Sequence, residues 1–419
     1  MRRSVVGSVL LVAACLVLAP SPATAAATCQ GQAATLVGVP GQPLDGTPGP
    51  DVMVSNGANA VAAGDGDDVV CLTRMPDFSQ VEAGAGDDVV VTQAAGYGKV
   101  LVTLGAGDDR FTGGAGRDDV YAYDPDATAD RVDGISTGAG HDTVWVNQVD
   151  TDGAGVAEPD RIHLGADQDT LVLSDAGLSA DARVDGGAGR DQLLMNFYDE
   201  TIDVAIDAER RTVERDGPYL QGWVSFEDYY VDNEQARVTF AGSGAAEEFS
   251  STARSLVARM AGGADRVRLS LSQRADVAGG AGRDEVVGLG SGRHEVWIDL
   301  AAGRIGTVES RGRSAGPRIA GFEDATADEG RRPVVVGDSL ANTLAAGCGT
   351  VRGQGGADRI VRSGPGTCRD FTAYGGSGDD LLVGNDGPDN LLGGPGRDEA
   401  RGRQGRDRCV AEVRLGCER

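Results

Sequence analysis

Aspartates recur in one short pattern along this chain, and their carboxylates are its most promising groups for chemistry. A Gly stands two residues before each Asp, except before Asp169, where Asp167 takes that place. An apolar residue stands two residues after each Asp. Carboxylate oxygens are ligands that calcium prefers, so a regular series of them predicts metal ligands. Fifteen positions share the pattern: Asp51, Asp68, Asp88, Asp109, Asp118, Asp142, Asp169, Asp191, Asp265, Asp284, Asp358, Asp380, Asp389, Asp398 and Asp407.

The pattern is most regular near the C-terminus, where residues 375–410 form four consecutive units of nine residues. Asp380, Asp389, Asp398 and Asp407 each occupy the sixth position of a unit. Glycine-rich hairpin turns need no fixed period, whereas stacked repeats do. The strict period therefore favours a solenoid over a series of isolated turns.

The other residues of the unit predict the elements that position these aspartates. The glycines permit positive φ and hence tight turns that aim carbonyl oxygens inward, while the apolar residue points from a short strand into the core. Two units make one coil, and coils stack at about 4.8 Å, the spacing of neighbouring strands. Half of that spacing, about 2.4 Å, lies within the calcium–oxygen range of 2.3–2.6 Å. We therefore expect calcium between coils, bound by one carboxylate from each coil and by turn carbonyls.

The unit GGxGxDxUx, in which U is apolar, resembles the RTX or hemolysin-type calcium-binding repeat. The resemblance is closest over residues 375–410, and scattered copies extend it upstream. It implies an all-β fold, a right-handed parallel β-roll or β-solenoid of calcium-binding nonapeptide repeats. It also implies that Ca²⁺ is the cofactor, held by the sixth-position aspartates and by backbone carbonyls of the turns.

The upstream copies depart from the regular repeat. Asp68, Asp88, Asp109, Asp142, Asp169 and Asp191 are more than eighteen residues apart. We interpret each interval as one coil with a loop inserted on the side that lacks the motif. His294 replaces the Asp in one copy, which weakens the prediction of a site there.

The chain is predicted to be exported. Arg2 and Arg3 precede an apolar run that ends in an A-x-A sequence, which is typical of a signal peptide over residues 1–25. In an alternative reading, Val12–Cys15 resembles a lipobox, which would place a lipid on Cys15. No second apolar segment follows, so we expect no membrane span. RTX toxins usually leave by a C-terminal signal and have few cysteines, so the resemblance favours secreted, extracellular repeat proteins of GC-rich Gram-positive bacteria over toxins.

Beyond the signal peptide, we expect four parts along the chain. Residues 26–195 form N-terminal β-roll repeats, and residues 196–260 form a degenerate, strand-rich solenoid segment. Residues 261–336 form a second repeat block with a loop, and residues 337–419 form a tandem β-roll with a disulfide-closed end. The alternating stretches IDVAIDAERR and VWIDLAAGRI resemble each other, and each predicts a strand pair that widens the solenoid.

Six cysteines remain after signal removal, and an even number in an exported chain predicts disulfides. Six cysteines allow fifteen pairings, so the sequence alone leaves the connectivity open. Proximity along the chain favours the pairs Cys29–Cys71, Cys348–Cys368 and Cys409–Cys417. We expect these pairs to restrain the solenoid ends, because terminal repeats lack a neighbour on one side.

Charge and motifs narrow the function. The net charge of -26 argues against nucleic-acid binding, since the chain would repel phosphate. The three histidines, His141, His163 and His294, are scattered and form no zinc-binding pair, and no G-x-S-x-G elbow or phosphate-binding loop occurs. We therefore expect a secreted calcium-binding repeat protein with a structural or surface-interaction role and not an enzyme. The alternative is a polysaccharide-modifying enzyme or adhesin that carries such repeats, and a cell-surface or polysaccharide partner stays open.

Overall fold

A computed structural model gives the architecture of the chain. It describes residues 27–74, 76–93, 98–122, 131–146, 159–174, 178–179, 181–198, 201–215, 218–271, 273–290, 295–309, 312–313, 316–328, 332–363 and 371–418. The predicted signal peptide over residues 1–25, Cys15, His294 and Cys368 lie outside the described residues. Every regular element in the described part is a β-strand, and no described helix could cross a bilayer. The predicted all-β class is confirmed.

One sheet, which we call the long sheet, runs through the whole molecule. Its strands pair only in parallel, each with the strand one coil before and one coil after it. In order they are β4 (Pro43–Asp45), β6 (Ala60–Asp65), β8 (Phe78–Ala85), β10 (Lys99–Ala106), β12 (Asp118–Ala122), β14 (Thr143–Val146), β16 (Thr170–Leu173), β18 (Gln192–Asn196), β22 (Asp228–Asp232), β24 (Glu248–Ser251), β27 (Arg266–Ser270), β30 (Glu285–Leu289), β35 (Asp324–Asp328), β37 (Thr343–Ala346), β39 (Arg359–Arg362), β41 (Leu381–Val383), β43 (Glu399–Arg401) and β45 (Val413–Leu415).

Two further sheets face the long sheet. The N-terminal facing sheet is parallel and holds β3 (Leu36–Val37), β5 (Val52–Val54), β7 (Val69–Leu72), β9 (Val89–Thr92), β11 (Arg110–Thr112), β13 (Gly134–Ala139), β15 (Arg161–Ala166) and β17 (Arg183–Ala188). The C-terminal facing sheet holds β19 (Asp203–Asp207), β20 (Thr212–Arg215), β21 (Pro218–Gln221), β23 (Arg237–Ala241), β25 (Ser255–Arg259), β28 (Arg274–Ala278), β31 (Glu295–Asp299), β32 (Arg304–Glu309), β33 (Gly312–Arg313), β34 (Arg318–Ala320), β36 (Val334–Val336), β38 (Gly349–Gly355), β40 (Phe371–Ser377), β42 (Asp389–Leu392) and β44 (Arg408–Val410). Two short pairs complete the strands, β1 (Thr28–Cys29) with β2 (Gln32–Ala33) and β26 (Gly262–Gly263) with β29 (Ala281–Gly282).

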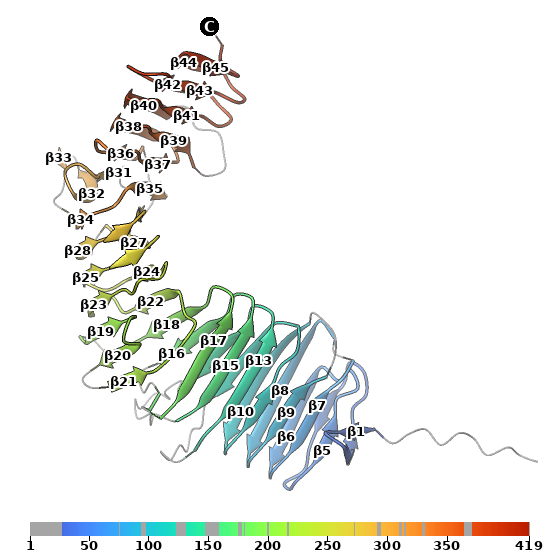
Figure 1. Cartoon of the computed structure of the whole chain (residues 1–419). Coiled ribbons are helices and arrows are strands. Elements are labelled where there is room, and N and C mark those ends of the chain that lie inside the picture. The colour runs from blue at the N-terminus through green and yellow to red at the C-terminus, as the bar shows by residue number, and fades with distance from the viewer. Residues whose placement is uncertain are drawn as a thin grey trace, which may run out of the picture.

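The chain passes alternately between the long sheet and a facing sheet, so the molecule is a parallel β-solenoid, as predicted. In the C-terminal array one coil takes eighteen residues, which pairs Leu382 with Ala400. Apolar side chains at every second strand position point between the sheets, as the pleat requires. Val81, Val102 and Val120 occupy successive rungs, and each is 0% exposed. Figure 1 shows that the coils from β5 to β17 and the coils from β23 to β45 stack along two different directions.

Two antiparallel hairpins are inserted where the nonapeptide pattern fades. Strand β19 pairs with β20, and strand β31 pairs with β32. These are the two stretches that resemble each other in sequence, and the prediction of a strand pair in each is confirmed. Both hairpins lie in the C-terminal facing sheet, where β19 and β31 also pair in parallel with β23 and β36.

The N-terminal disulfide attaches a hairpin to the first coils. Cys29 and Cys71 are bonded, as predicted. Both cysteines pack with Val54 in a small apolar cluster that is separate from the main core. Met53 and Val70 point into the main core, so their neighbours Val54 and Cys71 lie on the outer face of the facing sheet. The β1–β2 hairpin therefore covers the outer face of this sheet near its N-terminal end.

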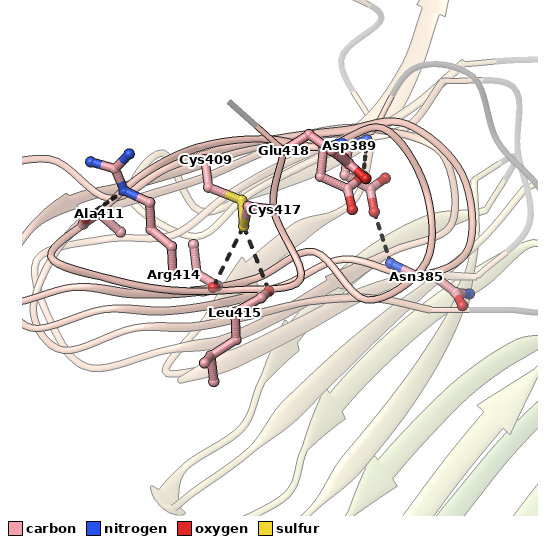
Figure 2. The surroundings of a disulfide bond; sticks show 10 residues. Asn385, Asp389, Cys409, Ala411, Arg414, Leu415, Cys417 and Glu418 are labelled. Carbon is pink, nitrogen blue, oxygen red and sulfur yellow. Dashed lines mark hydrogen bonds between the residues drawn. A yellow bond between two sulfur atoms is a disulfide. The ribbon is translucent and has the colours of Figure 1, made fainter.

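The last coil is closed by the predicted bond between Cys409 and Cys417 (Figure 2). The Cys417 Sγ lies 3.9 Å from the carbonyl oxygen of Ala400, one coil earlier. The third prediction involved Cys348 and Cys368. Cys348 is disulfide-bonded, whereas Cys368 lies outside the described residues.

Candidate metal centres

The fifteen predicted aspartates all lie where a bend meets the start of a strand, and none is more than 6% exposed. They line two opposite edges of the solenoid. The bends that lead from the long sheet into a facing sheet hold Asp51, Asp68, Asp88, Asp109, Asp389 and Asp407. The bends that lead into the long sheet hold Asp118, Asp142, Asp169, Asp191, Asp265, Asp284, Asp358, Asp380 and Asp398.

The interpretation of Asp109 and Asp142 as neighbours in one series is wrong. The backbone N–H of Asp109 donates to the Oδ1 atom of Asp133 at 2.9 Å. The Oδ1 atom of Asp142 accepts the backbone N–H of Asp118 at 2.8 Å, and this bond lies on the opposite edge. Asp133 has no Gly two residues before it, so the repeat pattern did not reveal it.

A hydrogen-bond ladder connects the aspartates along each edge. The N–H of Asp358 donates to the Oδ1 of Asp380 at 2.9 Å, and the N–H of Asp380 donates to the Oδ1 of Asp398 at 3.0 Å. Equivalent bonds join Asp68 to Asp88 and Asp389 to Asp407 at 2.8 and 2.9 Å. A charged acceptor strengthens such bonds. We call these series the aspartate ladders, and each step joins one coil to the next.

The second carboxylate oxygen of most ladder members is buried with no hydrogen-bond partner among the described residues. This holds for the Oδ2 atoms of Asp68, Asp88, Asp142, Asp160, Asp169, Asp191, Asp265, Asp284, Asp358, Asp380, Asp398 and Asp407 and for the Oδ1 atom of Asp389. Asp51 and Asp118 differ, because their Oδ2 atoms accept the backbone N–H of Thr47 and Gly114. A buried, charged carboxylate oxygen without a partner is unfavourable, so each of these oxygens needs a proton or a cation close by.

In the units that begin with Gly, this first glycine shows what lies beside the unpaired oxygen. A Cβ atom on Gly375 would stand 2.2 Å from the Oδ2 of Asp380 and 2.6 Å from the carbonyl oxygen of Gly393 in the next coil. Gly353 has the same surroundings, with the Asp358 Oδ2 at 2.0 Å and the Gly375 carbonyl oxygen at 2.3 Å. Two oxygens bound to one calcium ion are at most about 5 Å apart, and these pairs satisfy that limit.

The glycines of the unit therefore have two different functions. The second and fourth positions need positive φ, as predicted, with 116° at Gly376 and 130° at Gly378. At the first position, Gly375 is not among the residues with positive φ. A side chain on Gly375 is excluded because the Asp380 carboxylate and the Gly393 carbonyl occupy its space. Five upstream units instead begin with a residue that has a side chain: Ala63, Ala83, Leu104, Thr137 and Leu164. Asp167, at a fourth position, adopts a φ of 84°, which is uncommon for a residue other than Gly.

These residues fit calcium better than a metal that is bound by side chains alone. No three His, Cys, Asp or Glu side chains in the described part of the chain converge on one point. A complete shell must therefore include backbone carbonyls, which calcium accepts among its six to eight oxygen ligands and structural zinc sites do not use. The ladder carboxylates and the first-position carbonyls would hold the ion, whose charge would balance the buried carboxylates.

Four ladders end at a glutamate. The repeat pattern did not reveal these four residues. The Oε2 atoms of Glu227 and Glu323 accept the N–H groups of Asp191 and Asp284, at 3.0 and 2.9 Å. Glu412 and Glu418 do the same for Asp398 and Asp407, at 2.8 and 2.6 Å. Each Glu comes after the last aspartate of its ladder in the sequence. The Phe-Glu-Asp sequence shared by the two degenerate segments was the signal that could have revealed the first two.

Ion pairs to arginine accompany two of these endings. The Arg190 guanidinium lies 2.6 Å from an Asp228 carboxylate oxygen. Arg283 binds both oxygens of Asp324, at 2.8 and 2.7 Å. Both arginines stand at the fifth position of a nonapeptide, and both aspartates directly follow the ladder-ending Glu. A guanidinium therefore links the coils at each point where a hairpin is inserted.

Burial and mutual repulsion raise the pKa values of most ladder carboxyl groups, although the pKa of Asp51 is lowered. Burial raises the pKa of Asp88 to about 7, opposed by the N–H bond from Asp68 and increased by the charge of Asp109. The same causes raise the pKa of Asp380 to about 6, with Asp398 as the repelling neighbour. Burial and the charge of Asp142 raise the pKa of Asp118 to about 8. The ion-free ladders therefore hold protons that calcium must displace.

The calcium-free protein should consequently be more stable at acidic than at alkaline pH. The ladder groups bind protons more tightly in the fold than in the unfolded chain, where the pKa is 3.8. Their contribution to stability is fully present below that value and is lost as the pH rises through about 7. Far-UV circular dichroism of protein dialysed free of metal should show more β-structure at pH 5 than at pH 8. More structure at pH 8 would contradict the expectation.

The histidines and one pocket are the remaining candidates for chemistry. His141 is exposed on its turn, where its ring contacts the Gln168 carbonyl oxygen at 3.0 Å, and His163 lies 3.5 Å from Asp185. A pocket of 260 Å³ beside the first hairpin is lined by Glu227 and Glu247. Glu247 accepts the N–H of Ser243 at 2.9 Å, so both carboxylates already bind backbone groups.

The stacked coils, the aspartate ladders and the glycine-bounded oxygens define a β-solenoid whose turns could hold hard cations between successive coils. The family model of the RTX calcium-binding nonapeptide repeat matches the chain in four copies, over residues 96–124 and 374–409. The chain therefore contains RTX repeats, and the resemblance drawn from its sequence is confirmed. A search of curated proteins found no match.

Proposed function

We propose that this protein is an exported scaffold whose solenoid folds around Ca²⁺ ions bound between successive coils. The unpaired, buried oxygens of the aspartate ladders carry this proposal, since each needs a positive charge close by. The proposed ligands are the fifteen predicted aspartates, extended by Asp133 and Asp160. Two of the predicted disulfides fit an oxidising, extracellular location.

The proposed role is binding and not catalysis. The ladder carboxylates bind backbone N–H groups through one oxygen and are available to an ion through the other. Several acids outside the ladders pair with arginines, as Asp228 and Asp324 do. A regular, calcium-stiffened rod is suited to present a surface outside the cell.

The ligand assignment is tested by two aspartates that stand side by side. Asp398 is 1% exposed, and its Oδ1 accepts the N–H of Asp380, one coil earlier. Asp379 is exposed, and its Oδ1 accepts the N–H of Arg397, one coil later. Replacing either by Asn removes one charge and keeps an acceptor, so the two variants differ mainly in the proposed ion contact.

We expect Asp398→Asn to lower the number of bound calcium ions by at least one, because the ion loses a charged ligand. Asp379→Asn should bind as many ions as the unaltered protein. Isothermal titration with calcium measures both numbers. Equal stoichiometry in Asp398→Asn and the unaltered protein would refute the assignment.

A further inference from the structure

Asn342 occupies a ladder position although it is not an aspartate. It is the sixth residue of a unit that begins at Gly337, and it is 1% exposed. Its backbone N–H donates to the Oδ1 of Asp358 at 2.9 Å, as a ladder aspartate donates to the next coil. A Cβ atom on Gly337 would stand 2.3 Å from the Asn342 Oδ1 and 2.6 Å from the Gly353 carbonyl oxygen. These are the surroundings of Gly375, so Asn342 stands where the other coils have a carboxylate.

The side-chain amide of Asn342 needs no ion in this place. Its Oδ1 accepts the N–H of Asp338 at 2.9 Å. Its Nδ2 donates to the carbonyl oxygen of Glu323 at 2.8 Å and to the Oδ1 of Asp338 at 3.2 Å. The Oδ2 atoms of Asp358 and Asp380, in the next two coils, are buried without a partner among the described residues. A neutral amide with both of its polar atoms paired is satisfied without a cation.

The contact with Glu323 joins two ladders. The Glu323 side chain ends one ladder by accepting the N–H of Asp284, and its carbonyl oxygen accepts the amide of Asn342, which starts the next ladder. Strands β35 and β37, on the two sides of this joint, pair in parallel. The N–H of Thr343 also donates to the Oδ1 of Asp324 at 2.6 Å. The joint between these two coils is therefore made by donors and acceptors of the protein itself.

A guanidinium makes a similar joint on the opposite edge. Arg362 is the last residue of β39 and is 8% exposed. Its Nε donates to the carbonyl oxygen of Gly347 at 3.2 Å, and its Nη1 donates to the carbonyl oxygen of Asp386 at 2.9 Å. Gly347 follows β37 and Asp386 follows β41, so the guanidinium links the coil before its own to the coil after it. Burial raises the pKa of Asp389, the first aspartate of the ladder on this edge, to about 6, and the charge of Arg362 opposes this rise.

We propose that Asn342 and Arg362 take the place of calcium at the start of the last two ladders, so that the coils of β35, β37 and β39 stay stacked in the calcium-free protein. These coils are then the template on which residues 375–410 fold when calcium binds. Stacked repeats fold by adding one unit to the next, so a preformed pair of coils removes the unfavourable first step. This inference rests on the proposed function, because it states which joints of the scaffold depend on calcium.

The test uses two reciprocal substitutions in the full-length protein. Asn342→Asp removes the donor to Glu323 and places a second carboxylate beside Asp338, so the joint then needs a cation. Asp358→Asn, one coil later, removes a proposed ligand and keeps the amide joint. Gln32→Glu adds the same charge as Asn342→Asp at an exposed residue of the N-terminal hairpin and is the control.

Hydrogen exchange in EDTA at neutral pH measures the calcium-free joint. In the unaltered protein, β35 and β37 should exchange at least about tenfold more slowly than β41 and β43. Asn342→Asp should abolish this difference, whereas Asp358→Asn and Gln32→Glu should keep it. Calcium titration should count one ion more than in the unaltered protein for Asn342→Asp, one fewer for Asp358→Asn and the same number for Gln32→Glu.

Equal exchange of the two pairs of strands in the unaltered protein would overturn the inference. So would an Asn342→Asp variant whose exchange and ion count match those of the Gln32→Glu control. If the unaltered protein binds calcium and either result is found, this inference alone is contradicted. Absence of calcium binding by the unaltered protein would contradict the proposed function itself.

Discussion

Removal of calcium at neutral pH should expand the protein and abolish much of its β-structure. The chain has 64 acidic and 38 basic residues, and its ladders bring buried carboxylates together along both edges. Without cations these groups repel one another each time two coils stack. Because metal binding and folding are coupled in such sites, the energy of calcium binding is energy of folding.

Small-angle scattering and far-UV circular dichroism, before and after addition of EDTA, measure this change. The largest loss is expected over residues 375–410, where every unit contributes a ladder aspartate. Individual sites should bind with dissociation constants of about 10⁻⁴–10⁻³ M, as extracellular calcium modules do. Magnesium at the same ionic strength is the control and should not restore the fold, because it prefers shorter bonds and keeps its waters. An unchanged radius and spectrum in EDTA would contradict the prediction.

Gly375→Ala should be far more damaging than an ordinary substitution of glycine by alanine in a strand. The new methyl group would stand 2.2 Å from the Asp380 Oδ2 and 2.6 Å from the Gly393 carbonyl oxygen. Both atoms are proposed calcium ligands, so the substitution displaces them together. We expect a loss of about 1–3 kcal/mol in the free energy of unfolding, typical of overpacking, together with one bound ion fewer.

Gly355→Ala is the matched control for this substitution. It lies in the preceding coil, also has no positive φ, and its nearest neighbour would be the flexible Ser377 hydroxyl at 3.2 Å. Thermal unfolding in calcium should show a lower midpoint for Gly375→Ala and little change for Gly355→Ala. Similar midpoints in the two variants would show that the first glycine does not shape an ion site.

The parts of the structure that repeat at a fixed interval could be predicted from the sequence. The four tandem units placed Asp380 and Asp398 one coil apart, and the structure joins them by a ladder bond. The apolar residue two positions later predicted the core, and Leu382 and Ala400 are both 0% exposed. In these units, turn, strand and ligand positions are all specified within nine residues.

Features that arise between distant segments could not be predicted in this way. Asp133 and Asp160 continue a ladder without the glycine pattern, because only their place beside Asp109 in the stack makes them members. The same applies to the ladder-ending Glu227 and Glu323, whose longer side chains reach the preceding Asp from a different backbone position. From the sequence, only a conformational role could be predicted for the first-position glycine. Its contact with the next coil forms only after the coils stack.

The calcium content of the folded protein tests the account most directly. Equilibrium dialysis against calcium, followed by atomic emission on the protein fraction, counts the ions bound to each chain. Because most ladder steps offer one unpaired carboxylate oxygen, we predict on the order of ten ions per chain, released together on unfolding. One ion or none per folded chain would contradict the claim that the ladders bind calcium.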